Sequence, residues 1–350
     1  MTNTLLPPAQ KIPAAWYGPQ MTASEEWLVH LDEQEIAEVE TAVRAFLACS
    51  EGRAPLEATD FPLPRLAPKL QALRRELLDG RGFALLRGLP VQRWSQAEAA
   101  YAFVGLGAHL GNARSQNAAG HLLGHVRDVG LSSDDPNVRI YQTKDRQTFH
   151  TDSCDVVALL CLRRSRSGGE SLLVSSTTIY NEMLRRRPDL AAVLFKPIAT
   201  DRRGEVRQGQ KPYFEIPVFS WHAGKLTAIY HRPYIESAQR FEEAPRLTDL
   251  QREALDLFDT LAEDPALNMS MDFQPGDMQF VHNHVLLHDR NGFEDWPDPA
   301  QRRHLLRLWL ALPGARPLPE VFAQRYGRVT IGDRGGILLE DTVLRVPVEV

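Results

Sequence analysis

The sequence predicts a mixed α+β protein with a mainly β core. We expect a double-stranded β-helix (jelly roll) with flanking N-terminal helices and a helical insert. Between residues 139 and 312, short segments rich in Val, Ile, Leu, Tyr and Phe are separated by turns, as is typical of an antiparallel barrel or jelly roll. Before residue 139 apolar residues recur at helical spacing instead, and a helical pattern interrupts the strands at about residues 235–268.

Three helices and one strand are predicted in the N-terminal flank, about residues 1–138. The first helix begins at a cap formed by Asp32 and Glu35, and the third begins at a capping box over residues 95–98. The second helix ends at Gly80, and residues 83–87 form a short apolar strand. The apolar faces consist of Ile36, Val39, Val43 and Phe46 in the first helix and of Leu70, Leu73 and Leu77 in the second.

The core region, about residues 139–312, contains short apolar segments that we interpret as strands. Helical segments interrupt them at about residues 178–195 and in the insert, which contains a capping box at residues 248–251. No internal repeat or low-complexity linker divides the chain, and residues 313–350 form a C-terminal extension, so we predict a single catalytic domain over residues 1–350. The predicted strands are residues 139–143, 156–163, 171–176, 213–219, 226–231, 278–282 and 304–312.

Composition and charge favour a small-molecule enzyme over a protein that binds nucleic acid or membrane. The chain has 350 residues, of which 43% are hydrophobic, so it can bury a large core. A formal charge of −5 argues against a general nucleic-acid binder, which would carry a basic surplus. The apolar run at residues 156–162 is too short to span a bilayer, and the N-terminus lacks the pattern of a signal peptide. A homo-oligomer is compatible with the sequence.

The cysteines indicate a reducing compartment. Cys49, Cys154 and Cys161 are odd in number and have no CxxC spacing, so a disulfide framework is not expected. Cys154 and Cys161 lie in an apolar segment, where free cysteine behaves as a small core residue. We therefore expect reduced thiols and a cytoplasmic protein.

A candidate metal site is centred on His150 and Asp152. Residues two apart at the end of a strand project from the same face, so both side chains can reach one ion. The best candidate for a third ligand is His288, because two imidazoles and one carboxylate form the facial triad of non-haem Fe(II) oxygenases, which leaves coordination positions open. His284 is the alternative, four residues before His288, but residues 278–282 read as a strand and helical spacing loses its basis there.

Two arginines on one predicted strand indicate an anionic cosubstrate. Arg303 and Arg307 share a strand face with Leu305 and Trp309. Two guanidinium groups on the inner face of a barrel are costly to bury without anions. A dicarboxylate would supply them through bidentate hydrogen bonds. The alternative is that a carboxylate of the protein pairs with Arg307.

These motifs in combination resemble the taurine dioxygenase-like (TauD/TfdA) family of Fe(II)- and 2-oxoglutarate-dependent oxygenases. The resemblance runs from about Gly80 to about Leu312. It departs from the family pattern at Asp289, which replaces the glycine common after the last ligand. The segments that carry it are residues 149–155, the turn at 167–171, Pro275-Gly276-Asp277, residues 283–290 and residues 302–310.

The resemblance implies the cofactors and the roles of several residues. His150, Asp152 and His288 would bind Fe(II), and Arg303, as the first arginine of the pair, would hold the distal carboxylate of 2-oxoglutarate. Arg307 would contact the same cosubstrate, the first arginine or the substrate. A family threonine that touches the distal carboxylate matches Thr177 best, with Thr178 as the neighbouring alternative.

The implied reaction is hydroxylation of an unactivated C–H bond in a small organic substrate, which could be anionic. It consumes O2 and 2-oxoglutarate and releases succinate and CO2. Desaturation or ring closure uses the same ligands and stays open, as does a metal-binding barrel without redox chemistry. A structural role is the first expectation for His125 and Arg232, although both could line a substrate pocket together with Arg307.

Overall fold

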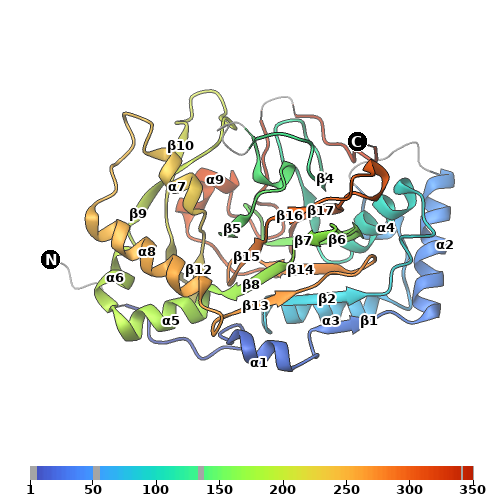
Figure 1. Ribbon diagram of the computed structural model, residues 1–350, viewed down its shortest axis with the longest axis horizontal. Coiled ribbons are helices and arrows are strands. Elements are labelled where there is room, and N and C mark those ends of the chain that lie inside the picture. The colour runs from blue at the N-terminus through green and yellow to red at the C-terminus, as the bar shows by residue number, and fades with distance from the viewer. Residues whose placement is uncertain (1–5, 50–55, 133–137, 340–341, 350) are drawn as a thin grey trace.

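The computed structural model describes residues 6–49, 56–132, 138–339 and 342–349. It has a mixed α and β fold with two main sheets in the middle, helices α2 and α4 at one end and helices α5 to α8 at the other (Figure 1). The helices are α1 (Gly18–Ala23), α2 (Glu33–Cys49), α3 (Ala67–Leu78), α4 (Gln96–Ala108), α5 (Ser176–Arg186), α6 (Pro188–Val193), α7 (Arg232–Ala238), α8 (Asp249–Glu263) and α9 (Ala323–Tyr326). Short 3-10 helices are η1 (Ala58–Asp60), η2 (Ile140–Gln142), η3 (Pro299–Gln301) and η4 (Glu320–Phe322).

The larger sheet is antiparallel except for its first pair, which is parallel. Its strand order is β1 (Leu28–His30), β2 (Phe83–Arg87), β14 (Met278–His282), β6 (Val156–Arg163), β17 (His304–Ala311) and β3 (Asn112–Arg114), and β4 (Leu123–Val126) also pairs with β17. Strands from the first, middle and last thirds of the chain thus lie side by side, so the N-terminal flank is part of the same sheet as the core.

The smaller main sheet is wholly antiparallel and carries the segments nearest the candidate site. Its order is β13 (Asn268–Met271), β8 (Ser171–Ser175), β15 (Leu286–Arg290) and β5 (Gln147–His150). Three two-stranded ribbons complete the described strands: β9 (Pro197–Asp201) with β10 (Tyr213–Pro217), β11 (Phe219–His222) with β12 (Lys225–Ala228), and β7 (Ser167–Gly168) with β16 (Phe293–Glu294).

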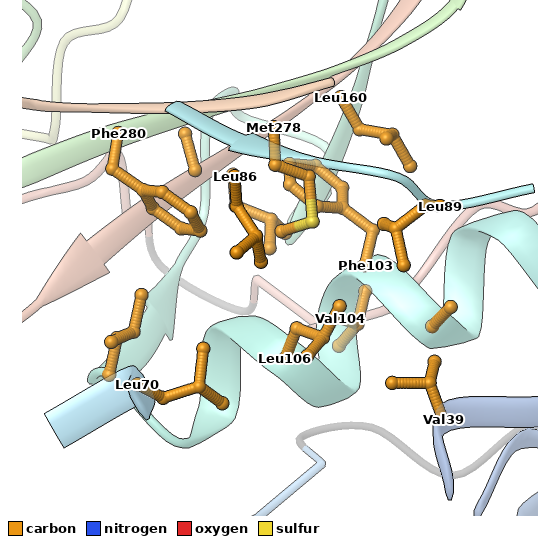
Figure 2. Packing of buried hydrophobic residues seen from close by; sticks show 14 of the residues in the cluster. Val39, Leu70, Leu86, Leu89, Phe103, Val104, Leu106, Leu160, Met278 and Phe280 are labelled. Carbon is orange, nitrogen blue, oxygen red and sulfur yellow. The ribbon is translucent and has the colours of Figure 1, made fainter. Parts of the chain in front are cut away.

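The two faces of the larger sheet pack against different partners because side chains alternate along each strand. On β17, Leu306 and Leu308 face the cluster that helices α2, α3 and α4 cover, as the packing around Leu86, Phe103 and Met278 shows (Figure 2). Leu305 and Trp309 belong instead to a second cluster, which includes Leu173 and Leu286 of the smaller sheet. The second cluster therefore joins the two sheets face to face, and Arg307 lies on that inner face of β17.

Most of the predicted elements are confirmed, although their ends shift. Asp32 and Glu35 cap α2 with reciprocal hydrogen bonds of 2.8 and 2.9 Å. Capping boxes also open α4 at Ser95 and α8 at Thr248. Among the described residues, no helix combines the length and apolar character needed to cross a membrane.

The strand predicted at residues 139–143 is wrong. Ile140–Gln142 form the 3-10 helix η2, and the following strand, β5, begins only at Gln147. The Thr143 backbone N–H and side-chain hydroxyl both donate to the Ile140 carbonyl, at 3.0 and 2.9 Å. Such local hydrogen bonding by threonine competes with strand pairing, and the apolar pattern of the segment does not reveal it.

Candidate metal centre

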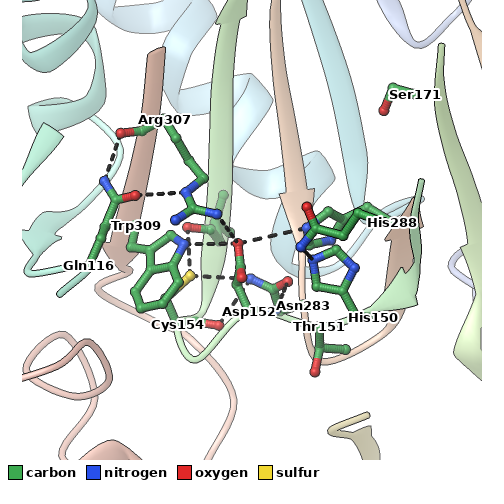
Figure 3. A network of polar contacts seen from close by, with 12 residues as sticks. Gln116, His150, Thr151, Asp152, Cys154, Ser171, Asn283, His288, Arg307 and Trp309 are labelled. Atoms are coloured by element: carbon green, nitrogen blue, oxygen red, sulfur yellow. Dashed lines mark hydrogen bonds and ion pairs between the residues drawn. The ribbon is translucent and has the colours of Figure 1, made fainter. Parts of the chain in front are cut away.

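The three predicted ligands meet at one end of the smaller sheet. β5 ends at His150, which pairs directly with His288 on the neighbouring strand β15. Directly opposed residues on antiparallel strands bring their side chains together, and the centroids of the two imidazole rings lie 4.1 Å apart. Asp152 Oδ2 lies 3.7 Å from His288 Nε2. One donor atom from each of the three residues can be chosen so that all lie within 4.8 Å of one another (Figure 3).

Hydrogen bonds orient the first histidine and the aspartate. His150 Nδ1 lies 2.8 Å from the Thr148 carbonyl oxygen and must donate to it, so the lone pair is on Nε2, which the Gln147 side-chain amide approaches to 2.9 Å. The Asp152 backbone N–H donates to Asn283 Oδ1 (3.0 Å), and Trp309 Nε1 donates to Asp152 Oδ2 (2.9 Å). Partners of this kind fix the tautomer and orientation of metal ligands in proteins.

Electrostatics favours neutral imidazoles beside an ionised carboxylate. Burial lowers the pKa of His150, and burial together with the neighbouring His150 lowers the pKa of His288 to about 3. Burial alone would raise the pKa of Asp152, but the charge of Arg307, the two histidines and the Trp309 hydrogen bond lower it to about 2. Near pH 7 the three groups are therefore in the protonation states in which they bind a cation.

The donor set fits a divalent transition-metal ion. Two donor atoms bonded to one ion at about 2.1 Å lie about 3 to 3.5 Å apart, close to the 3.7 Å between Asp152 Oδ2 and His288 Nε2. That distance is too long for a hydrogen bond. His288 Nδ1 is buried without a hydrogen-bond partner among the described residues. Two imidazoles and one carboxylate are the facial set that suits non-haem Fe(II) and leaves positions open for other ligands.

The triad lies on the border between two pockets. Its histidines line the first, which we call the inter-sheet pocket because β6 and β17 of the larger sheet and β8 and β15 of the smaller sheet surround it. Asp152 lines the second, which we call the lateral pocket and which extends towards β10 and α7. Three residues, Tyr141, Gln147 and Arg307, line both.

The inter-sheet pocket carries two buried arginines that lack carboxylate partners on their side chains among the described residues. Arg303 is 5% exposed and its Nη1 has no hydrogen-bond partner, while Asp295 accepts only its backbone N–H (2.7 Å). Arg290 donates to the backbone carbonyls of Thr143 and Asp145. Burial lowers the pKa of Arg303 to about 10 and that of Arg290 to about 9. Both arginines therefore remain cationic at neutral pH, and the pocket suits an anion.

The lateral pocket is lined in part by apolar side chains. Phe214, Ile216, Val218, Ile229 and Ile235 form much of its lining, and about 690 Å³ in it, its opening to solvent included, is free of protein atoms. A pocket of this size that combines apolar side chains with converging polar groups, here including Asp152 and Arg307, is typical of a small-molecule site.

Arg307 lies between the pockets, as expected for a residue that serves either of them. Its Nε donates to Gln116 Oε1 (2.7 Å), and its Nη1 lies 3.8 Å from Asp152 Oδ2. The guanidinium also stacks on Tyr141, with its central carbon 4.5 Å from the ring centroid. Arg307 therefore supports Asp152 electrostatically, in addition to any contact with a bound molecule.

Three other predicted site residues lie away from the pockets. Thr177 is buried in the first turn of α5 and lines neither pocket, whereas Ser171 on β8 lines the inter-sheet pocket. His125 lies 2.9 Å from both His304 Nε2 and the Pro347 carbonyl oxygen. Arg232 forms ion pairs with Glu236, Asp256 and Asp259, at 2.7 to 2.9 Å. Their placement does not support cosubstrate or substrate roles for these three.

Sequence reasoning missed two residues of the inter-sheet pocket, Ser171 and Arg290. Arg290 follows His288 by two residues on β15 and so projects from the same face, a spacing that could have revealed it. Ser171 is the cross-strand partner of Arg290, and only the pairing of the strands brings it there.

The departure at Asp289 has a local explanation. Its carboxylate pairs with Arg146 (2.6 Å), which also contacts Glu263 (2.8 Å). Asp289 is not among the converging donor groups, so the extra carboxylate adds an ion pair beside the site rather than a fourth ligand.

Comparison with known proteins identifies the family. The family model "Taurine catabolism dioxygenase TauD, TfdA family" matches residues 50–309. FR-33289 synthase of Streptomyces rubellomurinus is 32% identical over 87% of this chain and 91% of its own length. Taurine hydroxylase-like protein SAT17 of Stachybotrys chartarum is 34% identical over 84% of this chain and 77% of its own length.

The fold is likewise that of known oxygenases. An asparagine oxygenase crystallised with Fe(II), 3-hydroxyasparagine and succinate superposes with a TM-score of 0.62 at 18% identity, over 81% of this chain and 93% of that one. The chain therefore belongs to the TauD/TfdA family and is a non-haem iron dioxygenase that depends on 2-oxoglutarate.

Proposed function

We propose that this dioxygenase hydroxylates an unactivated C–H bond of a small organic substrate at an Fe(II) ion held by His150, Asp152 and His288. In this proposal 2-oxoglutarate occupies the inter-sheet pocket and the substrate occupies the lateral pocket. The observation that carries the proposal is the position of the triad on the border of the two pockets. Cosubstrate and substrate can then approach the same ion from different sides.

Arg303 is the anchor that we propose for the distal carboxylate of 2-oxoglutarate. Its buried, unpartnered Nη1 supports this role, because a buried guanidinium gains most from a bidentate carboxylate. We propose Ser171, in place of Thr177, as the hydroxyl that accompanies it, since Ser171 lines the same pocket. Arg290 adds a second positive charge there.

When bound, the iron would use 2-oxoglutarate and O2 to supply the oxidant for the C–H bond, with release of succinate and CO2. The chain contributes the geometry. His150, Asp152 and His288 would hold the ion on the border of the two pockets, and Trp309 and Arg307 hold the Asp152 carboxylate. The apolar wall of the lateral pocket keeps water from the reacting carbon and orients it.

The charge of the inter-sheet pocket favours this function over a metal-binding barrel without redox chemistry. A hydrolase that uses a metal-bound water needs no second anion site beside the metal, whereas the buried Arg303 and Arg290 suit the two-carboxylate cosubstrate. Desaturation and ring closure require the same ligands and the same pockets, so product analysis decides among the three outcomes.

We also propose that the whole chain is one catalytic domain with a jelly-roll core. The N-terminal strands β1, β2, β3 and β4 pair into the same sheet as the core strands, which supports one domain rather than two. The smaller sheet faces the larger one across a shared apolar cluster, which supports a double-stranded β-helix.

The test is anaerobic addition of 2-oxoglutarate to the protein loaded with Fe(II), followed by exposure to O2. We expect a visible metal-to-ligand charge-transfer band and then formation of succinate. Asp152→Ala should abolish both, while Arg164→Gln, which removes a surface arginine paired with Asp272, should leave both unchanged. Full succinate formation by Asp152→Ala would exclude the proposed site.

A further inference from the structure

The lateral pocket has two arginines in its wall besides Arg307. Arg139 precedes η2, and Arg325 lies in α9, far away in the sequence. The side chain of Arg325 is 7% exposed and that of Arg139 is 16% exposed. Neither residue belongs to the cosubstrate pocket, so the proposed function does not explain their burial.

Arg325 is fixed next to the metal centre. Its Nε donates to Ser153 Oγ (2.7 Å), and Ser153 directly follows Asp152 in the chain. Its guanidinium also packs against Phe214 of the pocket wall, with the central carbon 5.7 Å from the ring centroid. A group bound by Arg325 is therefore held close to the position of the iron, on the substrate side.

The carboxylates of the described residues do not balance the positive charge here. Glu205 pairs with both Arg139 and Arg325, the latter at 3.5 Å, so one negative charge serves two guanidinium groups. Asp134 and Asp135, which precede Arg139 in the sequence, lie outside the described residues.

Further arginines add to this excess rather than relieve it. Arg202 packs on the same Phe214 ring at 5.5 Å, and it donates to the backbone carbonyls of Lys211 and Gln324. Arg203 packs on Tyr234 at 5.3 Å and donates to the Val138 carbonyl. These neutral partners, to which Arg203 adds the Ser237 hydroxyl (3.5 Å), leave the charges uncompensated, and Arg203 Nε has no hydrogen-bond partner among the described residues.

A buried histidine offers another hydrogen-bonding atom in the same wall. His231 lines the lateral pocket and stacks on Tyr234, with ring centroids 3.6 Å apart. Its Nδ1 is buried and has no hydrogen-bond partner among the described residues. Unsatisfied buried polar atoms in a pocket commonly receive their partner from a ligand.

We propose that Arg139 and Arg325 form an oxyanion subsite in the lateral pocket, and that the primary substrate is a small anion whose carboxylate, sulfonate, phosphonate or phosphate group binds there. The inference rests on the proposed function for the identity of the pocket. Charge-assisted hydrogen bonds from arginine suit such groups, and the apolar wall would hold the carbon chain between the anion and the reacting carbon. The subsite thus selects an anionic substrate and sets which carbon faces the iron.

The test is a calorimetric titration of sulfate into the full-length protein loaded with Fe(II) and 2-oxoglutarate without oxygen, so that the cosubstrate already occupies Arg303 and Arg290. We expect saturable binding to the wild type. Its dissociation constant should rise at least about tenfold in Arg325→Gln and in Arg139→Gln, because each removes charge-assisted hydrogen bonds. Arg325→Lys, which keeps the charge, should lose less. Parallel titrations of methylphosphonate and acetate then rank the tetrahedral and planar oxyanions.

The matched control is Arg164→Gln, which also removes one arginine but lies outside both pockets and should bind sulfate like the wild type. Thermal unfolding checks that each variant is folded, and the more exposed Arg139 provides a second variant if Arg325→Gln does not fold. Equal sulfate affinity in wild type and Arg139→Gln, or no saturable binding to the wild type, would overturn the subsite. The charge-transfer band of the cosubstrate complex reports separately on the proposed function, because it depends on the metal ligands and the inter-sheet pocket and not on Arg139 or Arg325.

Discussion

Two buried groups each contain an aspartate from residues 150–155, a histidine from residues 283–290 and an arginine from further along the chain. They differ in whether the aspartate is hydrogen-bonded to its histidine. In the first, Asp155 accepts hydrogen bonds from His284 Nε2 (3.0 Å), Arg334 Nε (2.8 Å) and the Leu312 backbone N–H (3.0 Å). In the second, Asp152 and His288 face each other at 3.7 Å, and the nearby Arg303 has an unpartnered Nη1.

The difference separates a structural site from a ligand site. In the Asp155 group both carboxylate oxygens accept hydrogen bonds from the protein, and Asp155, His284 and Arg334 are all at most 1% exposed. The Asp152 group is nearly as buried, yet its donors converge without satisfying one another. His284 Nδ1 and His288 Nδ1 both lack a hydrogen-bond partner among the described residues. What points to an ion and a cosubstrate is therefore the convergence of ligand atoms around Asp152 that do not bond to one another, together with the unpartnered Arg303 Nη1.

Replacing His288 or His284 by alanine gives the largest expected difference between the two groups. His288→Ala should abolish iron retention and lower the rate of succinate formation at least about a thousandfold, since metal catalysis supplies several kcal/mol. His284→Ala should keep iron in the folded protein but lose about 3 kcal/mol of unfolding free energy, because it leaves a cavity and an unsatisfied Asp155. Metal analysis and urea denaturation of both variants measure this. Loss of iron from folded His284→Ala would break the comparison.

The arginines give the next contrast, with unfolding free energy and cosubstrate affinity as the two readouts. Arg334→Gln should cost about 3 to 5 kcal/mol of stability, as expected when one partner of a buried ion pair is removed. Arg303→Gln should cost far less stability but raise the KM for 2-oxoglutarate about 10- to 100-fold.

The matched control for this pair is Arg164→Gln, whose exposed ion pair should change stability by less than about 1 kcal/mol. If Arg303→Gln proved as unstable as Arg334→Gln while its KM stayed that of the wild type, Arg303 would be structural as well.

The sequence was sufficient for features that depend on local periodicity. The period of two along a strand correctly placed Arg307 on the same inner face of β17 as Leu305 and Trp309. The same period correctly predicted that the side chains of His150 and Asp152 lie close together at the end of β5. The capping signals likewise located the starts of α2, α4 and α8.

Features that depend on pairing between distant strands could not be read from one sequence. The family resemblance selected Thr177, but β8 ends at Ser175 and Thr177 lies in the helix that follows. Ser171 reaches the inter-sheet pocket only because β8 pairs with β15. In the same way, the spacing of His284 from His288 could not show that His284 pairs with Asp155.

The Asp155 group should also make stability depend on pH. Burial lowers the pKa of His284 to about 4, against 6.5 for a free histidine. The unfolded chain therefore binds a proton below about pH 6.5 that the folded protein excludes, so stability is full above pH 6.5 and falls as the pH drops towards 4. Between pH 6.5 and 5 this amounts to about 2 kcal/mol. Urea denaturation of the metal-free proteins should show that the unfolding free energy of the wild type falls between pH 6.5 and 5 by about 2 kcal/mol more than that of His284→Gln. Identical pH profiles of the two proteins would contradict this.

The smallest expected effect concerns Trp309, which contacts the predicted metal ligand Asp152 without being a ligand itself. Its indole N–H donates to Asp152 Oδ2 at 2.9 Å, and loss of such a supporting hydrogen bond typically weakens metal binding about 10- to 100-fold. We expect Trp309→Phe to lie near tenfold, because Arg307 and the backbone contact to Asn283 still orient Asp152. Competition with a chelator measures the iron affinity directly, without turnover.

Trp16→Phe is a close control for this variant. Trp16 packs in the same apolar cluster as Trp309, and its indole N–H also makes one hydrogen bond, at 2.9 Å, but to the Arg81 carbonyl. Both variants lose an indole and one hydrogen bond, so both should lose similar stability, whereas only Trp309→Phe should lose iron affinity. Equal iron affinity in the two variants would show that the Asp152 carboxylate needs no help from Trp309. In that case the hydrogen bond from the Asp152 backbone N–H to Asn283 and the charge of Arg307 are sufficient to orient the Asp152 carboxylate.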